Sequence, residues 1–312
     1  MSEPIVIDGL VKTYKGGFRA VDELSLTVPK KGFVGFLGPN GAGKTTTIKI
    51  MTNMLSATSG HVYINGTDAT EDPKKALADV GAVVETPEFY PYLTPMETLE
   101  YLGKLRGMSS QDIKKRSKDV LELVKMEENK DKRIGEFSKG MKQRIAIAQA
   151  VLHEPSVIIL DEPTSGLDPR GMFEVRQVLN DLKKADFTIF MSSHMLNEVQ
   201  EVCTHAFLIN RGRLIKSGLV SDLVKETKGK KIEVRTANPI DIQTTARMAN
   251  ELKLKGLFVN GPYTFTFDVV NGDEEQAKAL LDLQALGLKI VSYKESGVAL
   301  ESFYMSLISD TR

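Results

Sequence analysis

Hydrophobic and polar residues alternate along the first part of the chain with the two-residue period of β-strands. This alternation predicts strands at residues 5–10, 24–28 and 61–64, and the last of them ends at the turn dipeptide Asn65-Gly66. Short apolar runs predict further strands, several of them buried on both faces, at residues 31–37, 80–84, 157–160, 188–191 and 206–209.

The period changes to that of a helix after residue 94. Residues 95–125 carry apolar side chains such as Met96, Leu99 and Leu102 at helical spacing among many charges. We expect a helical insert here, within a helical subdomain at about residues 87–150. Another helix is predicted at residues 45–55. Strands that alternate with helices predict a largely parallel sheet covered by helices.

A smaller unit follows the basic, glycine-containing stretch at residues 227–231, which is typical of a linker. The order strand, helix, strand, strand, helix, strand is that of a ferredoxin-like α+β domain. We expect two domains, residues 1–226 and 230–312, with no catalytic constellation in the second. The elements predicted there are strands at residues 232–235, 257–260, 263–269 and 288–293 and helices at residues 242–252, 274–286 and 300–308.

Composition and charge restrict the function. The 41 lysines and arginines balance 41 aspartates and glutamates, so nothing indicates a general nucleic-acid surface. The single cysteine, Cys203, excludes an intrachain disulfide framework and is expected to be a small apolar helix residue. Since no signal peptide and no apolar run of membrane-spanning length is found, we expect a cytoplasmic protein that reaches a membrane only through a partner.

The strongest chemical signal follows the strand predicted at residues 31–37. The segment fits the P-loop pattern, because glycines let backbone N–H groups turn toward phosphate oxygens and the next helix adds partial positive charge. Lys44 is expected to neutralise the β- and γ-phosphates, and the Thr45 hydroxyl to bind Mg²⁺. The predicted polyphosphate loop consists of Gly38, Pro39, Asn40, Gly41, Ala42, Gly43, Lys44, Thr45 and Thr46.

Two carboxylates follow the buried strand predicted at residues 157–160. Ligands bind at this end of the strands in open α/β sheets. Asp161 can hold Mg²⁺, directly or through water, opposite the Thr45 hydroxyl, and Glu162 can polarise the water that attacks the γ-phosphate. Two solvated acids at a strand end would be ordinary alone, but beside a P-loop they indicate a catalytic site.

Residues 137–144, FSKGMKQR, add a third motif. They resemble the signature loop of ATP-binding cassette (ABC) proteins, usually Leu-Ser-Gly-Gly-Gln, and keep Ser138 and Gly140. With the other motifs, about residues 3–225 resemble the nucleotide-binding subunit of an ABC transporter. That resemblance implies a P-loop NTPase fold, a RecA-like parallel sheet with an antiparallel β subdomain. It also implies that Ser138, Lys139 and Gly140 form an anion cradle for the γ-phosphate held by an opposite subunit; taken alone, Ser138 would be a helix N-cap.

The resemblance assigns three more residues. Asp168 ends a segment, SGLD, that matches the D-loop, which links the two nucleotide sites. His194 matches the switch histidine that contacts the γ-phosphate and orients water. Tyr14 matches the aromatic residue on which adenine stacks, with an ordinary strand-end tyrosine as the alternative. We expect structural roles for the other histidines, His61, His153 and His205.

Glu85 departs from the family pattern, which has glutamine after this strand. Glutamate can still bind Mg²⁺ but adds negative charge beside the phosphates. Together with the signature form, it resembles subfamilies that export bacitracin- and lantibiotic-type peptides or confer immunity to them. We hypothesise that Glu85 binds Mg²⁺ and couples the site to a partner. Residues 89–93 lie where the family receives a coupling helix, although they could equally pack within the helical insert.

The resemblance therefore implies an ATPase subunit that binds two Mg-ATP at a head-to-tail dimer interface, with a second copy of this chain as the expected partner. It would drive a separate integral-membrane permease, an exporter, from the inner face of the cell membrane. The alternative is a soluble ABC ATPase that acts on nucleic acid or the ribosome. One cassette and an insert of ordinary length favour the transporter.

Overall fold

The computed structural model describes residues 3–185, 187–225, 230–270 and 272–295. The chain divides into two compact units, residues 1–220 and 221–312, with α8 (Val220–Lys225) at the boundary. The helix predicted at residues 300–308 and most of the linker predicted at residues 227–231 lie outside the described residues.

A four-stranded antiparallel sheet opens the first unit. Its order is β2-β1-β4-β5, with β1 (Ile5–Thr13), β2 (Arg19–Val28), β4 (Ser59–Ile64) and β5 (Thr67–Asp68). The turn between β4 and β5 is the predicted Asn65-Gly66, and both residues have positive φ, 50° and 81°, as a tight hairpin turn requires. This sheet is the predicted antiparallel subdomain.

The residues predicted from sequence to bind nucleotide follow strands of the second sheet. Its order is β10-β9-β3-β8-β7-β6, and all neighbours are parallel except the edge strand β10 (Arg213–Leu219). The parallel strands are β3 (Phe33–Leu37), β6 (Val80–Val83), β7 (Val157–Leu160), β8 (Thr188–Ser193) and β9 (His205–Asn210). Every residue of β3, β7 and β8 is buried, because helices cover both faces. The mixed β pattern and the helices confirm the predicted α/β fold class.

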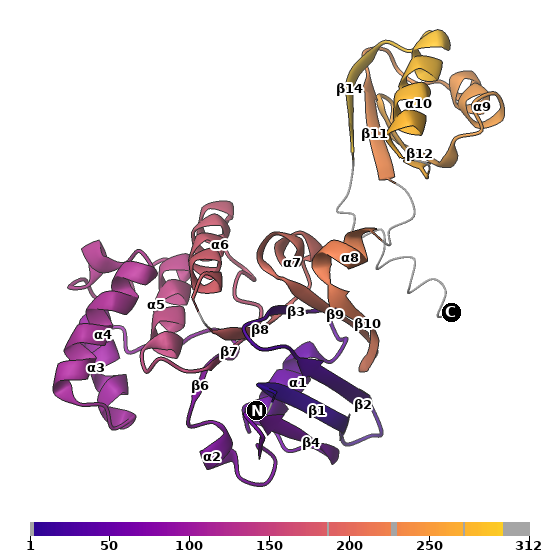
Figure 1. Ribbon diagram of the computed structural model, residues 1–312. Helices are drawn as coiled ribbons and strands as arrows, with labels where there is room; N and C mark the ends of the chain where they lie inside the picture. The colour runs from indigo at the N-terminus through magenta and orange to yellow at the C-terminus, as the bar shows by residue number, and fades with distance from the viewer. Residues whose placement is uncertain (1–2, 186, 226–229, 271, 296–312) are drawn as a thin grey trace. The chain divides into compact units, whose positions relative to one another are not determined.

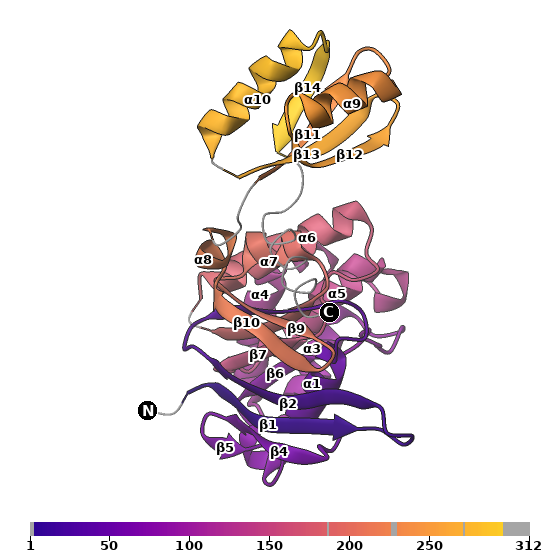
Figure 2. The same ribbon diagram turned by 90° about the vertical axis from the view of Figure 1, so that its right-hand side faces the viewer.

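Helix α1 (Lys44–Met51) lies between the two sheets (Figures 1 and 2). Its residues Ile48, Ile50 and Met51 belong to one buried core with apolar residues of both sheets. It is shorter than the predicted helix at residues 45–55, since Asn53 adopts a left-handed φ of 57°. Ala76 of α2 (Pro73–Ala76) belongs to the same core, whereas α6 (Pro169–Lys183) and α7 (Leu196–Val202) lie outside it.

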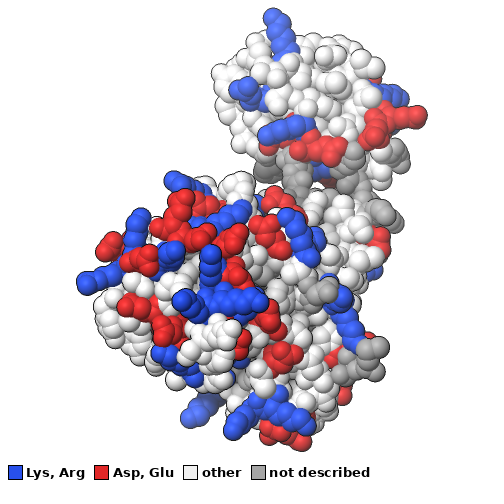
Figure 3. Space-filling view, turned by 60° about the vertical axis from the view of Figure 1, so that its left-hand side comes forward, with Lys and Arg blue, Asp and Glu red and all other residues white. Residues whose placement is uncertain are grey.

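The helical insert consists of α3 (Pro95–Leu105), α4 (Ser110–Leu123), two short 3₁₀ turns (Glu127–Asn129 and Ile134–Glu136) and α5 (Lys139–Val151). The predicted helical stretch is divided because Gly107 has a φ of 77° and Ser109 caps α4. Thr94 begins α3 with a capping box to Glu97. Basic and acidic side chains are interspersed over the face of the molecule in Figure 3.

In the second unit, the described residues 230–270 and 272–295 form a four-stranded antiparallel sheet of order β12-β13-β11-β14 and two helices. The core of this unit includes Phe265 and Phe267 of β13 together with Met248 and Leu283 from the helices. The chain order is that of the split βαβ motif. Its elements are β11 (Lys230–Thr236), α9 (Ile242–Asn250), β12 (Lys255–Gly261), β13 (Thr264–Val269), α10 (Asp273–Ala285) and β14 (Ile290–Glu295).

Candidate active site

The P-loop lies between β3 and α1, and close packing fixes its shape. Gly41 and Gly43 have φ values of 81° and 103°, which side chains disfavour. A Cβ on Gly43 would lie 2.3 Å from the carbonyl oxygen of Ala20, and one on Gly38 would lie 2.6 Å from that of Ile209. The glycines are therefore required both by the turn and by the backbone that presses against it.

Lys44 is folded back onto this loop. Its Nζ donates to the carbonyl oxygens of Gly38, at 2.9 Å, and Pro39, at 3.2 Å, and lies 3.1 Å from Glu162 Oε1. The side chain is only 4% exposed. The ammonium group is thus held inside the loop, next to the acid that follows β7.

Asp161 lies opposite the first turn of α1, as predicted. Its Oδ1 is 3.4 Å from the Thr45 hydroxyl and accepts a 2.6 Å hydrogen bond from Ser192 of β8. Burial raises the pKa of Asp161 above its ordinary value, although Ser192 and Thr45 oppose that change. Ser192 was not predicted from the sequence. Its position at the end of β8, the parallel strand next to β7, could have indicated that it lies near Asp161.

Glu162 is held by three groups from different elements. Its carboxylate contacts Lys44 and lies 2.9 Å from His194 Nδ1, and its backbone N–H donates to Ser192 Oγ at 2.9 Å. Burial raises the pKa of Glu162, but Lys44 and His194 outweigh that effect and hold it below its ordinary value. The left-handed φ of 44° turns this residue away from the strand.

A pocket of about 230 Å³ lies over the loop and reaches Glu162. Tyr14 lines it, 40% exposed, with its hydroxyl 3.4 Å from Thr46 Oγ1. Phe18, 64% exposed, lines it as well and was missed in the sequence. It is brought there by the hairpin turn in which the Tyr14 N–H donates to the Phe18 carbonyl oxygen at 2.8 Å. The pocket therefore has two aromatic side chains above a phosphate-binding loop.

A wider cleft of about 980 Å³ runs from Thr45 past Asp161 and Glu162 to Glu85 and Lys139. Ser165, Gly166 and Leu167 of the predicted D-loop line this cleft, whereas Ser138, Gly140 and Asp168 line neither the cleft nor the pocket. Ser138 caps α5 by accepting from the Met141 N–H at 3.2 Å, and Asp168 caps α6 by accepting from the Gly171 N–H at 3.2 Å. Gly140 permits the close approach of these two helix starts, since a Cβ there would lie 3.0 Å from Gly171 Cα.

Glu85 follows β6 at the same edge of the sheet and forms an ion pair with Lys49 of α1. Its backbone φ is 64°, again left-handed. The hydrogen bond and charge of Glu85 raise the pKa of Lys49. Lys49 was missed because no motif marks it; only its position one helical turn beyond Thr45 placed it on the relevant face.

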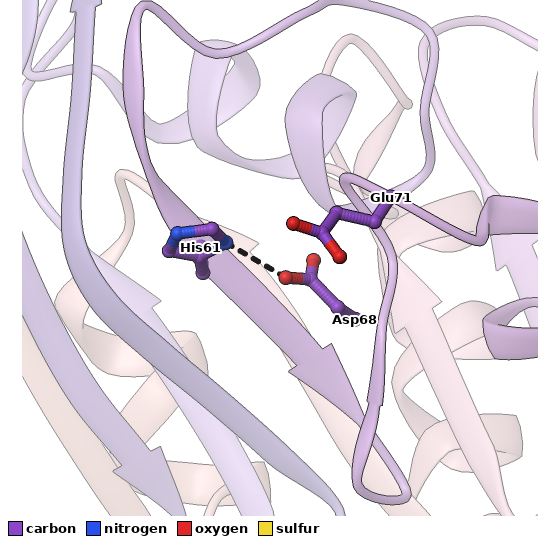
Figure 4. Close-up of side chains that lie close together, drawn as sticks. All are labelled: His61, Asp68 and Glu71. Carbon is purple, nitrogen blue, oxygen red and sulfur yellow. Dashed lines mark hydrogen bonds and ion pairs between the residues drawn. The ribbon is translucent and has the colours of Figure 1, made fainter.

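The remaining histidines lie outside both cavities. His61 Nδ1 lies 2.7 Å from Asp68 Oδ2, and Glu71 is close enough that the three side chains offer ligand atoms within 4.8 Å of one another (Figure 4). The hydrogen bond accounts for the approach of His61 and Asp68. Burial and Arg106 lower the pKa of His153 to about 4, and burial lowers the pKa of His205.

A Gly-rich loop between a strand and a helix, with two acids at the end of another parallel strand of the same sheet, defines a P-loop nucleoside triphosphatase. The chain's residues 21–165 match the family model described as ABC transporter. It is 39% identical to the bacitracin transport ATP-binding protein BcrA of Bacillus licheniformis over 76% of both chains. It is 34% identical to the uncharacterized ABC transporter ATP-binding protein YcbN of Bacillus subtilis (strain 168), over 99% of this chain and 98% of that one.

A solved structure resembles the first unit. It is the dimeric post-hydrolysis state of the ATP-binding cassette MJ0796 bound to ADP and Pi, with a TM-score of 0.62 and 25% identity over 69% of this chain and 98% of that one. This chain belongs to the ABC transporter family. It is an ATP-hydrolysing, ATP-binding subunit of a transporter, as predicted, and the relatives do not support the soluble alternative. None of the described helices has the length and apolar character to cross a membrane.

Proposed function

We propose that the chain hydrolyses Mg-ATP within a head-to-tail dimer and so drives a separate integral-membrane permease that exports its substrate. The observation that carries the catalytic part is the position of Glu162, which contacts Lys44 and His194 at the mouth of the P-loop pocket. A carboxylate held between two potential cations, with a lowered pKa, stays ionised and can accept a proton.

The residues fit a magnesium nucleotide. Thr45, Asp161 and Glu85 supply hydroxyl and carboxylate oxygens along one cleft, the donors that Mg²⁺ prefers. Bound Mg²⁺ would neutralise charge on the phosphate oxygens. Close packing of Gly38 and Gly43 against the carbonyl oxygens of Ile209 and Ala20 fixes the loop in a shape whose backbone N–H groups can bind a phosphate chain.

This chain's own side chains have distinct tasks in hydrolysis. Lys44 exchanges its loop carbonyls for phosphate oxygens, and the loop amides complete the cradle. Tyr14 stacks on the base. Glu162 orients the attacking water and takes its proton, while His194 orients the Glu162 carboxylate and contacts the γ-phosphate. Most of the rate then comes from positioning and electrostatics.

A dimer would account for the predicted site residues at the starts of two helices, α5 and α6. Ser138 and Gly140 lie at the start of α5, and Asp168 starts α6. We propose that Ser138, Lys139 and Gly140 contact the γ-phosphate in a second, identical chain, and that Asp168 lies at the same interface. The dimeric state of MJ0796 with ADP and Pi supports this arrangement.

The permease contact is proposed next to residues 84–89. A cavity of about 360 Å³ is lined by Met54, Phe89 and segments of β6 and α5. Tyr90 and Tyr92, 54% and 62% exposed, lie beside it in sequence with ring centroids 5.7 Å apart. Exposed aromatic side chains are typical interface anchors. They would hold the protein at the cytoplasmic face of the membrane.

We further propose that residues 1–226 form the nucleotide-binding domain, with the helical subdomain at about residues 87–150. Residues 230–312 would form a ferredoxin-like accessory domain. The division of the chain near residue 220 supports two domains. Export is supported by the relative named for bacitracin transport.

The test is a pull-down of tagged Glu162→Gln protein with Mg-ATP from its native cells, in gentle detergent, followed by mass spectrometry. Slow hydrolysis should hold the closed dimer and its partner. The matched control is Glu162→Gln/Lys44→Ala, which should bind no nucleotide and lose the partner. ATP-dependent recovery of a polytopic membrane protein is expected. Recovery of ribosomal or nucleic-acid-associated proteins alone would contradict the proposal.

A further inference from the structure

One ion pair made by a residue of the cleft, Glu85, connects segments that are distant in the sheet. Glu85 follows β6, the outermost strand, whereas Lys49 lies on α1, which follows β3. Strands β8 and β7 separate β3 from β6. The pair therefore crosses the carboxyl ends of these strands, where Asp161 and Glu162 lie.

The charges lining this cleft are predominantly acidic on the β6 and β7 side. Glu85, Glu88, Asp161 and Glu162 all line it. Lys44 already contacts Glu162. Among the residues that the structure describes, Lys49 is the one cation in ion-pair contact with Glu85. Without it, Glu85 would place an uncompensated negative charge in the cleft that the nucleotide phosphates must enter.

The backbone conformation of Glu85 is one that is common at functional sites. Glu85 has a left-handed φ of 64°, a conformation that side chains adopt at a cost and that is concentrated at functional sites. Lys49 lies four residues after Thr45 on α1, so both side chains emerge from one helix face. The side chain of Lys49 is 30% exposed and that of Glu85 is 56% exposed, so the pair can open without disrupting the core.

We propose that Lys49 is a positioning residue that acts as the dedicated counter-charge for Glu85. It lets this site carry glutamate after β6 without weakening its hold on the phosphates. This inference rests on the proposed function, since it concerns the same nucleotide site. Its consequence is that the effect of replacing Lys49 depends on the residue at position 85.

The experiment measures the affinity of the purified full chain for a fluorescent ADP analogue with Mg²⁺, at low and high salt. In the parent background, Lys49→Met should weaken binding roughly fivefold through the uncompensated carboxylate. High salt should shrink this loss, because screening weakens interactions between exposed charges. Lys49→Arg should bind like the parent chain. In the Glu85→Gln background, Lys49→Met should change binding less than about twofold.

Controls separate charge from folding. Lys74→Met removes an exposed lysine of α2 that has no ion-pair partner in the described structure, and it should leave binding unchanged. Urea unfolding of the nucleotide-free chains checks that each variant is folded. If Lys49→Met does not fold, the comparison of Lys49→Gln with Lys49→Arg replaces it.

The outcomes distinguish this inference from the proposed function. Equal weakening in the parent and Glu85→Gln backgrounds would show that Lys49 acts independently of Glu85 and would overturn the inference. If binding weakened in neither background, Lys49 and Glu85 would form an ordinary surface ion pair, and the inference would be overturned as well. Failure of the parent chain to bind Mg-nucleotide would instead contradict the proposed function.

Discussion

The glutamates that follow β7 and β6 occupy the same position relative to their strands but differ in their environment. Each has a left-handed φ at the carboxyl end of a parallel strand, Glu162 at 44° and Glu85 at 64°. Glu162 is 22% exposed and contacts both Lys44 and His194. Glu85 is 56% exposed and pairs with Lys49. Several partners fix a carboxylate, whereas one exposed ion pair holds it weakly.

This difference indicates that the acids after β7 and the acid after β6 have different roles in one cleft. The acids after β7 have the fixed geometry that proton transfer needs. The acid after β6 can leave its partner at little cost in free energy, as a group that responds to nucleotide or to a neighbouring protein must. The following experiments test the two halves of this comparison.

Glu162→Gln should have the largest effect. It retains the shape of the side chain but removes the base, so ATP hydrolysis should fall by about 10²–10⁴-fold while nucleotide binding persists. Steady-state phosphate release and equilibrium binding of a fluorescent nucleotide measure the two. A variant that keeps more than about a tenth of the parent rate would contradict the role of Glu162 as general base.

Ser192→Ala tests whether the hydrogen bonds of Ser192 hold the two acids after β7, Asp161 and Glu162, in place. Ser192 donates to Asp161 and accepts from the Glu162 backbone N–H, and it is fully buried. Leaving these groups unpaired should lower the free energy of unfolding by about 1–3 kcal/mol in urea denaturation. The matched control is Ser117→Ala, because Ser117 is equally buried and its hydroxyl has no hydrogen-bond partner in the described structure. Equal losses in both variants would contradict the interpretation.

Asp161→Asn tests how much the buried charge of Asp161, the other acid after β7, destabilises the folded chain. The test is the pH dependence of the free energy of unfolding. Burial raises the folded-state pKa of Asp161 above 3.8. Well below that pH the group is protonated in both states. As pH rises toward the folded pKa, the unfolded state ionises while the native state resists ionisation, so the parent chain loses stability. The variant should therefore gain free energy of unfolding relative to the parent as pH rises from about 4 to about 7.

Urea denaturation at the two pH values measures this gain. Asp8→Asn, an exposed position of β1, is the control and should show the same difference from the parent at both values. A stability difference for Asp161→Asn that does not depend on pH would exclude burial of the charge as its cause.

Glu85→Gln should have the smallest effect on stability, because it breaks only an exposed pair. The free energy of unfolding should change by less than about 1 kcal/mol. Nucleotide binding without Mg²⁺ should change by less than about twofold, since Lys49 already offsets the charge of Glu85, and more Mg²⁺ should be needed for half-maximal ATPase. Unchanged Mg²⁺ dependence together with an unchanged ATPase rate would sink the hypothesis that Glu85 takes part in the site.

Much of the site could be predicted because its chemistry lies in short contiguous motifs. A glycine loop before a helix and two acids after an apolar strand imply their own backbone geometry, and the structure brings Lys44, Asp161, Glu162 and His194 together. Phe18, Ser192 and Lys49 could not be found in this way. Each is ordinary in its local sequence and gains its partner only through a turn, a neighbouring strand or a helix face.

The edge strand β10 shows the same limit for the fold. No strand was predicted at residues 213–219, and antiparallel pairing with β9 makes them a strand. Sequence by itself determined the periodicities, the P-loop and the acids, because these depend on local backbone preference and on side-chain chemistry. Only the tertiary structure decided that Glu162 has several partners and Glu85 one, since burial and charge pairing arise from strands far apart in the chain.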